Sequence, residues 1–404
     1  MSQIFVLKYS TVALIIMLLV IAVGYMLGRI DIKGVRLGSS GVFISAVIAG
    51  CIIGALCDIT SKNDTTTLIG SVNNIATVSQ NIGLILFITA IGYTAGPTFV
   101  KTIKNGAVSF IILSAIVVTA GLGTTLLIWV CDKNLGLADA FGLMMGALTS
   151  TPGLSSAKDA FPELKDMVQT MNAIAYPFGV LGACLFVQIV PKFFNKNLEE
   201  AKQKLDNTEK DESKTISNVK NEEKLIEFDK TGLAMYCLAG IFGIILGSIT
   251  IPGINFNLTT TGGCLISGLI FGLVGKVGKL SLKVPKNTLS VLKETGLVFF
   301  LYGSGISGGF GFLPEISQHP IYFVYGMIIT LVPMVIGFIV ALRCFKMDIL
   351  TNLGAITGAM TSTPALGALE QVAQTDNVSS CYTATYPLAL FLLVIIPQIV
   401  KLFI

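Results

Sequence analysis

Ten apolar segments, separated by short polar stretches, run along the chain. Most approach the roughly 20 residues that cross a bilayer core as an α-helix, and the shorter ones can span by thinning the bilayer or by snorkelling of flanking residues. The pattern predicts an all-α polytopic membrane protein whose first segment is a retained helix, because no small-residue cleavage site follows it. The segments lie at residues 11–27, 41–57, 82–100, 107–130, 172–190, 232–251, 262–275, 295–312, 321–342 and 383–400.

Composition agrees with this class. The chain has 404 residues, of which 53% are hydrophobic and 12% are charged, whereas soluble globular proteins carry about 25% charged residues. One stretch, residues 197–230, is rich in both acidic and basic side chains and poor in apolar ones, so it is predicted to be a solvated linker. The linker divides the chain into a first membrane repeat, residues 1–196, and a second, residues 231–404.

The two halves are copies of one another. Gly-Ala-Leu-Thr-Ser-Thr-Pro at 146–152 returns as Gly-Ala-Met-Thr-Ser-Thr-Pro at 358–364, and Tyr176-Pro177 returns as Tyr386-Pro387. Glycines of other segments match in the same order, which chance similarity between apolar runs would not produce. Duplicated broken segments inside hydrophobic surroundings are typical of membrane transporters with paired half-sites.

Loop charges indicate how the copies are oriented. Short cytoplasmic loops carry the excess of lysine and arginine. Loops that are rich in these residues in the first half correspond to loops that are poor in them in the second half. The loop after span one holds Arg29, Lys33 and Arg36, whereas its equivalent at 251–261 holds none. The switch favours inverted repeats of about five spans each, with both termini outside and the linker cytoplasmic, over a parallel twelve-span arrangement.

In the inverted arrangement, residues 138–161 and 350–373 are hairpins that re-enter on one side, and in the parallel one they cross. Non-helical backbone at membrane depth is tolerated only where protein or water covers it. The Thr-Ser-Thr-Pro segments therefore predict hydrated sites that are enclosed by protein. There, helix N-termini and hydroxyl groups can bind an anion. The alternative is that each segment only kinks a helix. The candidate substrate-binding residues are the two segments and three polar residues that follow them: Thr149, Ser150, Thr151, Pro152, Asn172, Tyr176, Thr361, Ser362, Thr363, Pro364 and Tyr386.

Four further residues are secondary candidates. Gly96-Pro97 could break a helix near the site, and Gly309 occupies the equivalent glycine row, although small residues also serve helix packing. Lys158 could pair with a substrate carboxylate, although with Asp159 it is better interpreted as a solvated loop pair.

The sequence contains few residues that could form a metal site, a catalytic site or a membrane-embedded acidic pair. There is one histidine, His319, and the eight cysteines lie in or beside apolar runs without a C-x-x-C pair. We therefore expect no metal, cofactor or enzymatic activity, and no nucleic-acid partner. The absence of an acidic pair within the spans argues against a cation or proton antiporter built on membrane aspartates.

The duplicated segments Gly142–Pro152 and Gly354–Pro364, placed around a hydrophilic linker, resemble the aspartate:alanine exchanger family. The resemblance implies a homodimeric secondary transporter in a bacterial inner membrane, which exchanges small anionic or zwitterionic substrates such as aspartate, alanine or succinate. It also implies an elevator-like movement of a core against a scaffold. Family members commonly carry large soluble modules in the central loop, and here only the linker is present. The alternatives are an ion-coupled antiporter and a channel.

Overall fold

The computed structural model describes residues 8–32, 35–36, 38–57, 61–104, 108–193, 228–251, 256–257, 259–375 and 377–402. The predicted linker lies outside these residues, apart from residues 228–230.

The described residues of the first half form helices, their connecting loops and one short β-hairpin. The antiparallel pair of β1 and β2 joins the first two helices, with Ile32 opposite Val35. The elements are α1 (Tyr9–Arg29), β1 (Asp31–Ile32), β2 (Val35–Arg36), α2 (Ser40–Leu56), α3 (Leu68–Lys104), α4 (Val108–Cys131), α5 (Leu137–Ala147), α6 (Thr151–Ala160), the 3-10 turn η2 (Pro162–Leu164) and α7 (Lys165–Phe193).

The second half repeats this order of elements. Its β3–β4 pair stands where β1–β2 stands in the first half, and a further hairpin, β5–β6, precedes the third helix. The elements are α9 (Leu233–Ser248), β3 (Thr250–Ile251), β4 (Phe256–Asn257), α10 (Thr259–Val274), β5 (Lys276–Val277), β6 (Leu280–Ser281), α11 (Lys286–Gln318), α12 (Ile321–Arg343), α13 (Ile349–Ala359), α14 (Thr363–Ala373) and α15 (Val378–Leu402).

Seven helices of the described chain are long and apolar enough to cross a membrane: α1, α3, α4, α7, α11, α12 and α15. The other three predicted spans are α2, α9 and α10, which have 17, 16 and 16 residues. At about 1.5 Å per residue they are shorter than a bilayer core of about 30 Å. The protein is thus a multi-pass membrane protein.

Several helices extend well beyond the apolar runs that predicted them. The run at 82–100 belongs to α3, which begins at Leu68, and the run at 295–312 belongs to α11, which begins at Lys286. The first turns of α3 carry polar side chains that interrupt the apolar run. Hydropathy alone therefore places the helix start too late.

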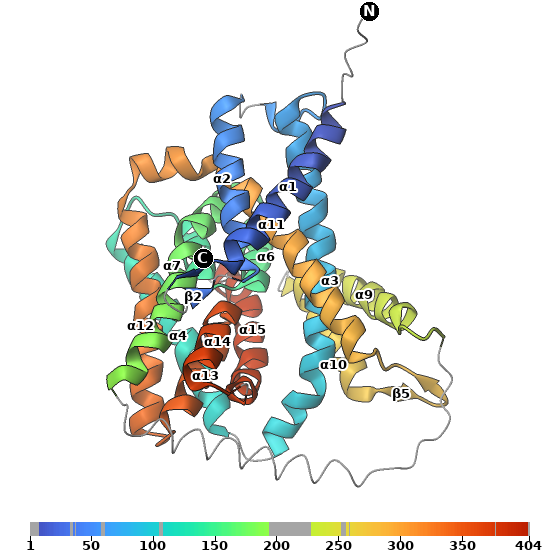
Figure 1. Ribbon diagram of the computed structural model, residues 1–404, viewed down its shortest axis with the longest axis vertical. Coiled ribbons are helices and arrows are strands. Elements are labelled where there is room, and N and C mark those ends of the chain that lie inside the picture. The colour runs from blue at the N-terminus through green and yellow to red at the C-terminus, as the bar shows by residue number, and fades with distance from the viewer. Residues whose placement is uncertain are drawn as a thin grey trace, which may run out of the picture.

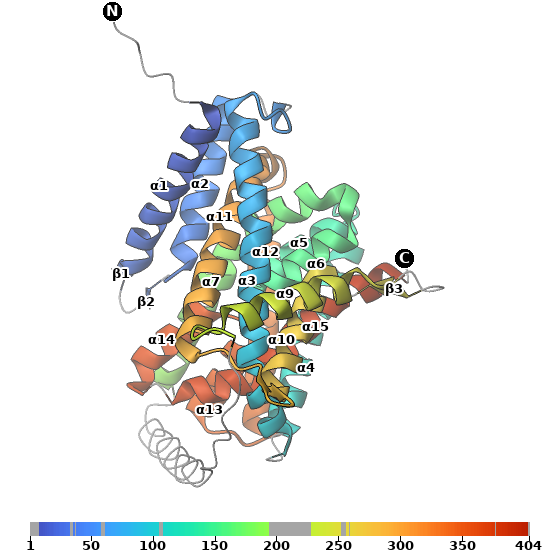
Figure 2. The same ribbon diagram turned by 90° about the vertical axis from the view of Figure 1, so that its right-hand side faces the viewer.

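The helices form two bundles, each built from equivalent elements of both halves. In the first, α3 and α11 pack against each other and against α1, α2, α9 and α10; we call this the α3–α11 bundle. The second contains α4, α7, α12, α15 and the short helices α5, α6, α13 and α14; we call this the hairpin bundle. Figure 1 shows α3, α9 and α10 on one side of the molecule and α4, α12, α13 and α14 on the other. Figure 2, turned by 90°, shows α5 and α6 to the right of α3.

Glycines allow the helices of the α3–α11 bundle to approach closely. A Cβ added to Gly83 of α3 would lie 2.5 Å from the carbonyl oxygen of Gly296 in α11, and one added to Gly96 would lie 2.6 Å from that of Leu269 in α10. Gly309 of α11 faces Gly50 of α2 in the same way. Such contacts are the usual role of small residues between membrane helices.

Candidate functional site

The two Thr-Ser-Thr-Pro segments are the tips of two short helical hairpins. In the first, the ring of Phe141, near the start of α5, lies 5.9 Å from that of Phe161, which directly follows α6. The start of α5 and the end of α6 are therefore adjacent, and the tip lies at the far end. The second hairpin is built in the same way from α13 and α14, with its tip between Ala359 and Thr363.

Each tip ends its first helix with the same turn. In the first hairpin the N–H of Thr149 donates to Gly146 O at 3.0 Å, and that of Ser150 donates to Met145 O at 2.9 Å. This is the Schellman pattern, in which the residue after the C-cap adopts the left-handed conformation and is usually glycine. Here it is threonine in both copies: φ is 52° at Thr149 and 53° at Thr361.

A β-branched residue with positive φ is an outlier. Such strain costs on the order of 1–3 kcal/mol, and it clusters at ligand-binding and switch positions. Glycine would relieve this strain at either tip, yet both copies carry threonine. The threonine side chain is therefore expected to serve a purpose other than stability.

The two tips touch through these threonines. Thr149 Oγ1 donates to the carbonyl oxygen of Met360 at 3.2 Å, and Thr361 Oγ1 donates to that of Leu148 at 2.9 Å. Thr149 and Thr361 are each 7% exposed. The reciprocal bonds join residues more than 200 positions apart and bring the two halves of the chain to one point.

Both tips then begin a new helix, with proline in its first turn. Proline fits there because it lacks the N–H that a first turn would leave unpaired. The helix N-termini differ in their caps. Ser150 Oγ accepts a hydrogen bond from the N–H of Gly153 at 3.1 Å, whereas Ser362 makes no side-chain cap bond and its buried Oγ has no partner among the described residues.

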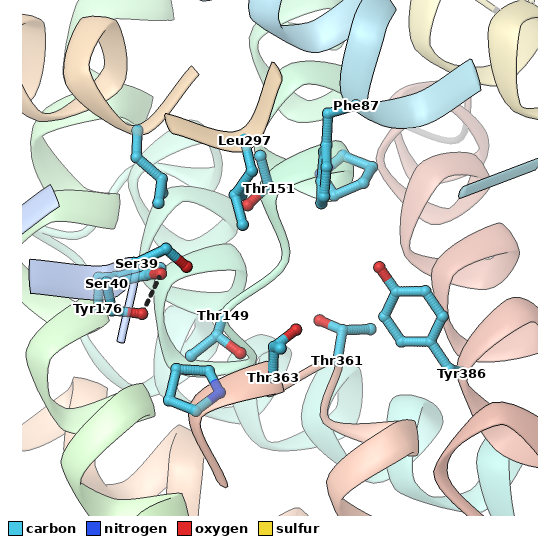
Figure 3. A pocket seen from close by; sticks show the side chains of 13 residues that line it. Ser39, Ser40, Phe87, Thr149, Thr151, Tyr176, Leu297, Thr361, Thr363 and Tyr386 are labelled. Carbon is cyan, nitrogen blue, oxygen red and sulfur yellow. Dashed lines mark hydrogen bonds between the residues drawn. The ribbon is translucent and has the colours of Figure 1, made fainter. Parts of the chain in front are cut away.

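A small cavity of about 30 Å³ lies against the two tips, at the junction of the two bundles. A water molecule needs at least about 10–15 Å³ measured in this way, so in this conformation the cavity has room for little more than water. Figure 3 shows the threonines of both tips lying between Tyr176 and Tyr386. The predicted residues among its lining are Thr149, Thr151, Pro152, Tyr176, Thr361, Thr363, Pro364 and Tyr386.

The two tyrosines stand at equivalent places beside the tips. Tyr176 of α7 packs its ring 4.2 Å from that of Phe43, and its hydroxyl lies 3.3 Å from Ser40 Oγ. Tyr386 of α15 stacks on Tyr382, whose hydroxyl lies 3.4 Å from Thr363 Oγ1. Hydroxyl groups thus line part of the cavity, and they can donate to an anion and accept from an ammonium group.

The remaining predicted residues lie outside the lining of this cavity. Ser150 and Ser362 are the helix N-caps. Asn172 is buried in α7, where its backbone carbonyl oxygen lies close to Gly146. Gly96 and Gly309 lie at the helix contacts described above, and Pro97 lies within α3.

Lys158 lies in helix α6 and is half-buried, so its interpretation as part of a solvated loop is wrong. Its ammonium group donates to Gln80 Oε1 at 3.1 Å and to Gln169 Oε1 at 3.0 Å. The sequence could not bring these three residues together, because they belong to different helices.

Sequence reasoning missed five residues of the lining. The sequence offered a weak signal for the two serines, because they directly follow a glycine, Gly38. In the structure Gly38 has φ of 55° and α2 begins two residues later, at Ser40. No such signal marked the apolar residues of α3 and α11, which share their composition with every other span. The missed residues are Ser39, Ser40, Phe87, Leu297 and Leu301.

Comparison with known proteins identifies the family. A family model named for aspartate:alanine exchangers, and described as a predicted permease membrane region, matches residues 16–192 and 235–402. The break between the two matched ranges contains the predicted linker.

Similar proteins occur in several bacteria. An uncharacterized transporter of Bacteroides fragilis is 25% identical over 548 aligned positions, which cover 95% of this chain and 96% of that protein. A putative transport protein of Dichelobacter nodosus is 23% identical, covering 96% of this chain and 98% of that protein. A putative transport protein of Aeromonas salmonicida is 24% identical, with coverage of 95% and 97%.

These alignments are longer than the 404-residue chain, so the relatives contain residues with no counterpart here. The family match nevertheless extends over both membrane halves and both hairpins. The chain is therefore a membrane transporter that belongs to the aspartate:alanine exchanger family of permeases.

Proposed function

We propose that the protein exchanges small carboxylates or amino acids, such as aspartate, alanine or succinate, across a bacterial inner membrane, and that the substrate binds between the two hairpin tips. The observation that carries the proposal is the meeting of two strained Thr-Ser-Thr-Pro tips at one cavity. A substrate carboxylate there would face two helix N-termini and several hydroxyls, which together favour negative charge.

The small volume of the tip cavity bears on the mechanism. Because a cavity of about 30 Å³ has room for little more than water, substrate binding requires the cavity to widen. Separation of the tips would widen it and would break the two reciprocal threonine bonds. Thr363 is exposed whereas Thr151 is 8% exposed. In this conformation the second tip is therefore the more accessible of the two.

Two contacts at or near helix ends support inverted repeats. Tyr325 OH, near the start of α12, donates to Asp132 Oδ2 at 3.0 Å, and Lys62 Nζ lies 2.6 Å from Asp166 Oδ2. The inverted arrangement puts all four residues on the outer face. The parallel twelve-span arrangement would put Asp132 and Tyr325 on opposite faces, and likewise Lys62 and Asp166.

The two bundles suggest how access would alternate. Both tips belong to the hairpin bundle, whereas one wall of the cavity, with Phe87, Leu297 and Leu301, belongs to the α3–α11 bundle. A movement of the hairpin bundle along that apolar wall would carry the site between the two faces, as in elevator-like transporters. A homodimer, as the family resemblance implies, would hold the α3–α11 bundle fixed.

Counterflow in proteoliposomes tests the exchange. Liposomes loaded with unlabelled aspartate, alanine or succinate should accumulate the labelled form of at least one of them, because each outward step of an exchanger returns an external substrate. Absence of counterflow with all three, or ohmic conductance in a planar bilayer, would contradict an exchanger.

Cysteine accessibility tests the inversion independently. In a background that lacks the exposed Cys131, Cys237 and Cys344, a membrane-impermeant thiol reagent should label Lys62→Cys in intact cells and Lys279→Cys only in inside-out vesicles. Labelling of both from the same face would exclude the proposed topology.

A further inference from the structure

A second and much larger cavity lies beside the first hairpin. Its volume is about 840 Å³, and it extends between α3 of one bundle and α6 and α7 of the other. α3 contributes a polar row at helical spacing, Asn73, Thr77, Gln80 and Asn81, on one face of a helix that is otherwise largely apolar. A polar stripe on a membrane helix indicates that this face of the helix contacts water. A cavity of about 840 Å³ can hold a hydrated organic anion.

Lys158 reaches this cavity from α6 and is held by amide groups. Gln169 Nε2 donates to Ser304 O at 2.9 Å and to Ser304 Oγ at 2.7 Å. Because the amide nitrogen is engaged in this way, the amide oxygen of Gln169 faces Lys158, and the amide of Gln80 also donates to that oxygen at 3.2 Å. The ammonium group of Lys158 is thus oriented by neutral oxygens on α3 and α7.

The side chains that line the cavity carry one more positive charge than negative charges. Its lining includes Lys62, Lys158 and Lys165 but only two carboxylates, Asp159 and Asp166. One of these carboxylates, Asp166, is already paired with Lys62. Just outside the lining, the hydroxyl and N–H of Thr66 lower the pKa of the Asp64 carboxyl, which is fully exposed and screened by water. The hydrogen bonds of Lys158 within the described residues go to two neutral amide oxygens. An added carboxylate would strengthen its binding, because a charge-assisted hydrogen bond is stronger than a neutral one.

The positive charge is specific to the first hairpin. Lys158 is the seventh residue after Thr151, and the seventh residue after Thr363 in the second hairpin is Glu370. The duplication therefore does not explain the lysine, since the equivalent position carries the opposite charge. A role that belongs to one end of the transport path explains the difference.

We propose that this cavity is a docking site for anions, in which Lys158 binds the carboxylate of the transported substrate before the substrate reaches the tips. The inference rests on the proposed function and adds a charged site that is separate from the tip cavity. Lys158 and Thr151 lie on the same helix, so a carboxylate held by Lys158 lies about two turns of α6 from the first tip. The contact between Lys158 and Gln80 joins the two bundles, and an anion there would replace it.

The test uses purified full-length protein in proteoliposomes, with succinate as the probe. Lys158→Gln removes the charge but keeps a hydrogen-bonding side chain, and Gln80→Glu neutralises Lys158 with a nearly isosteric carboxylate. Each variant should raise the succinate concentration at half-maximal exchange about tenfold, which is the loss of one charge-assisted bond. The maximal exchange rate should change little, because the tip site is intact, and Lys158→Arg should restore the affinity.

Lys133→Gln is the matched control, because Lys133 is an exposed lysine of the α4–α5 loop outside the cavity. It should leave the half-maximal concentration unchanged. If Lys158→Gln does not fold, Gln80→Glu decides the question, since it adds a partner for the lysine. Unchanged affinity in Gln80→Glu, or in a folded Lys158→Gln, overturns the docking site while wild-type exchange preserves the proposed function. Absence of exchange by the wild type overturns both.

Discussion

The two hairpin tips have nearly the same sequence but different surroundings. They share six of seven residues, the same left-handed threonine and the same reciprocal bond to the other tip. Yet Ser150 caps its helix and Ser362 does not, and Thr151 is buried whereas Thr363 is exposed. The shared features are those of the backbone turn and the contact between tips. The differences lie in the capping of the helix N-termini and in the exposure of their threonines.

This comparison separates two roles of the repeated segment. The turn and the threonine bond hold the tips together and must be the same in both copies, since each bond has its counterpart in the other. The helix N-termini face different environments, because the hairpin bundle presents them differently to the α3–α11 bundle. An uncapped N-terminus with an unpartnered hydroxyl is the better place for an added acceptor, such as a carboxylate.

The largest expected effect is on transport. Thr151→Ala and Thr363→Ala should each reduce exchange about tenfold or more, because each removes a hydroxyl that would bond a charged substrate, and the loss should be greater for Thr363 at the uncapped and accessible tip. Initial rates of counterflow at equal amounts of folded protein measure this. Thr119→Ala serves as the control, since Thr119 is exposed on α4 and its hydroxyl donates to the carbonyl oxygens of Ala115 and Ile116 in the same helix. Unchanged exchange in both tip variants would reduce the segments to helix kinks.

A smaller effect is expected on the contact between tips. Thr149→Val and Thr361→Val keep the β-branched shape and remove one hydroxyl each, so each should lower the free energy of unfolding by about 1–2 kcal/mol by leaving a buried carbonyl unpaired. The double variant should lose less than the sum, because the first loss already loosens the second bond. Thermal unfolding in detergent gives all three values. Strict additivity would mean that the two bonds are independent.

The smallest effect distinguishes the caps. Ser150→Ala should lower the free energy of unfolding by about 1 kcal/mol, the usual cost of losing an N-cap. Ser362→Ala should change it by much less, since it removes a buried hydroxyl that bonds nothing in the described structure. The two variants are each other's control, measured by the same unfolding transition. Equal losses would show that the two tips are capped alike and would remove the asymmetry.

Much of the fold followed from local sequence. Apolar runs of nearly bilayer length predicted the long helices, because only helices satisfy their own backbone within lipid. The doubled segment predicted two equivalent breaks, and both are present as hairpin tips. Helix starts were predicted less well. The polar side chains of α3 that line the large cavity interrupt its apolar run, and hydropathy cannot separate such a row from a loop.

The site was predicted only in part, and the reason is distance along the chain. The tip threonines and both tyrosines could be found because duplication marks them. Phe87, Leu297 and Leu301 could not, since an apolar residue in one span looks like any other until packing selects its neighbours. Lys158 resembled a loop residue because its neighbour Asp159 is also charged. No local pattern in the sequence relates Lys158 to Gln80 or Gln169.

The sequence by itself determined the class of protein, its duplication and the residues of the tips, because hydropathy, repeated motifs and turn chemistry are local properties. Only the tertiary structure decided that the tips bond to each other, that one helix N-terminus is capped and the other is not, and that a lysine of the first hairpin lies among amides of the other helices. These depend on how two bundles, each assembled from both halves, pack together. Packing of that kind joins residues hundreds of positions apart, and no local pattern records it.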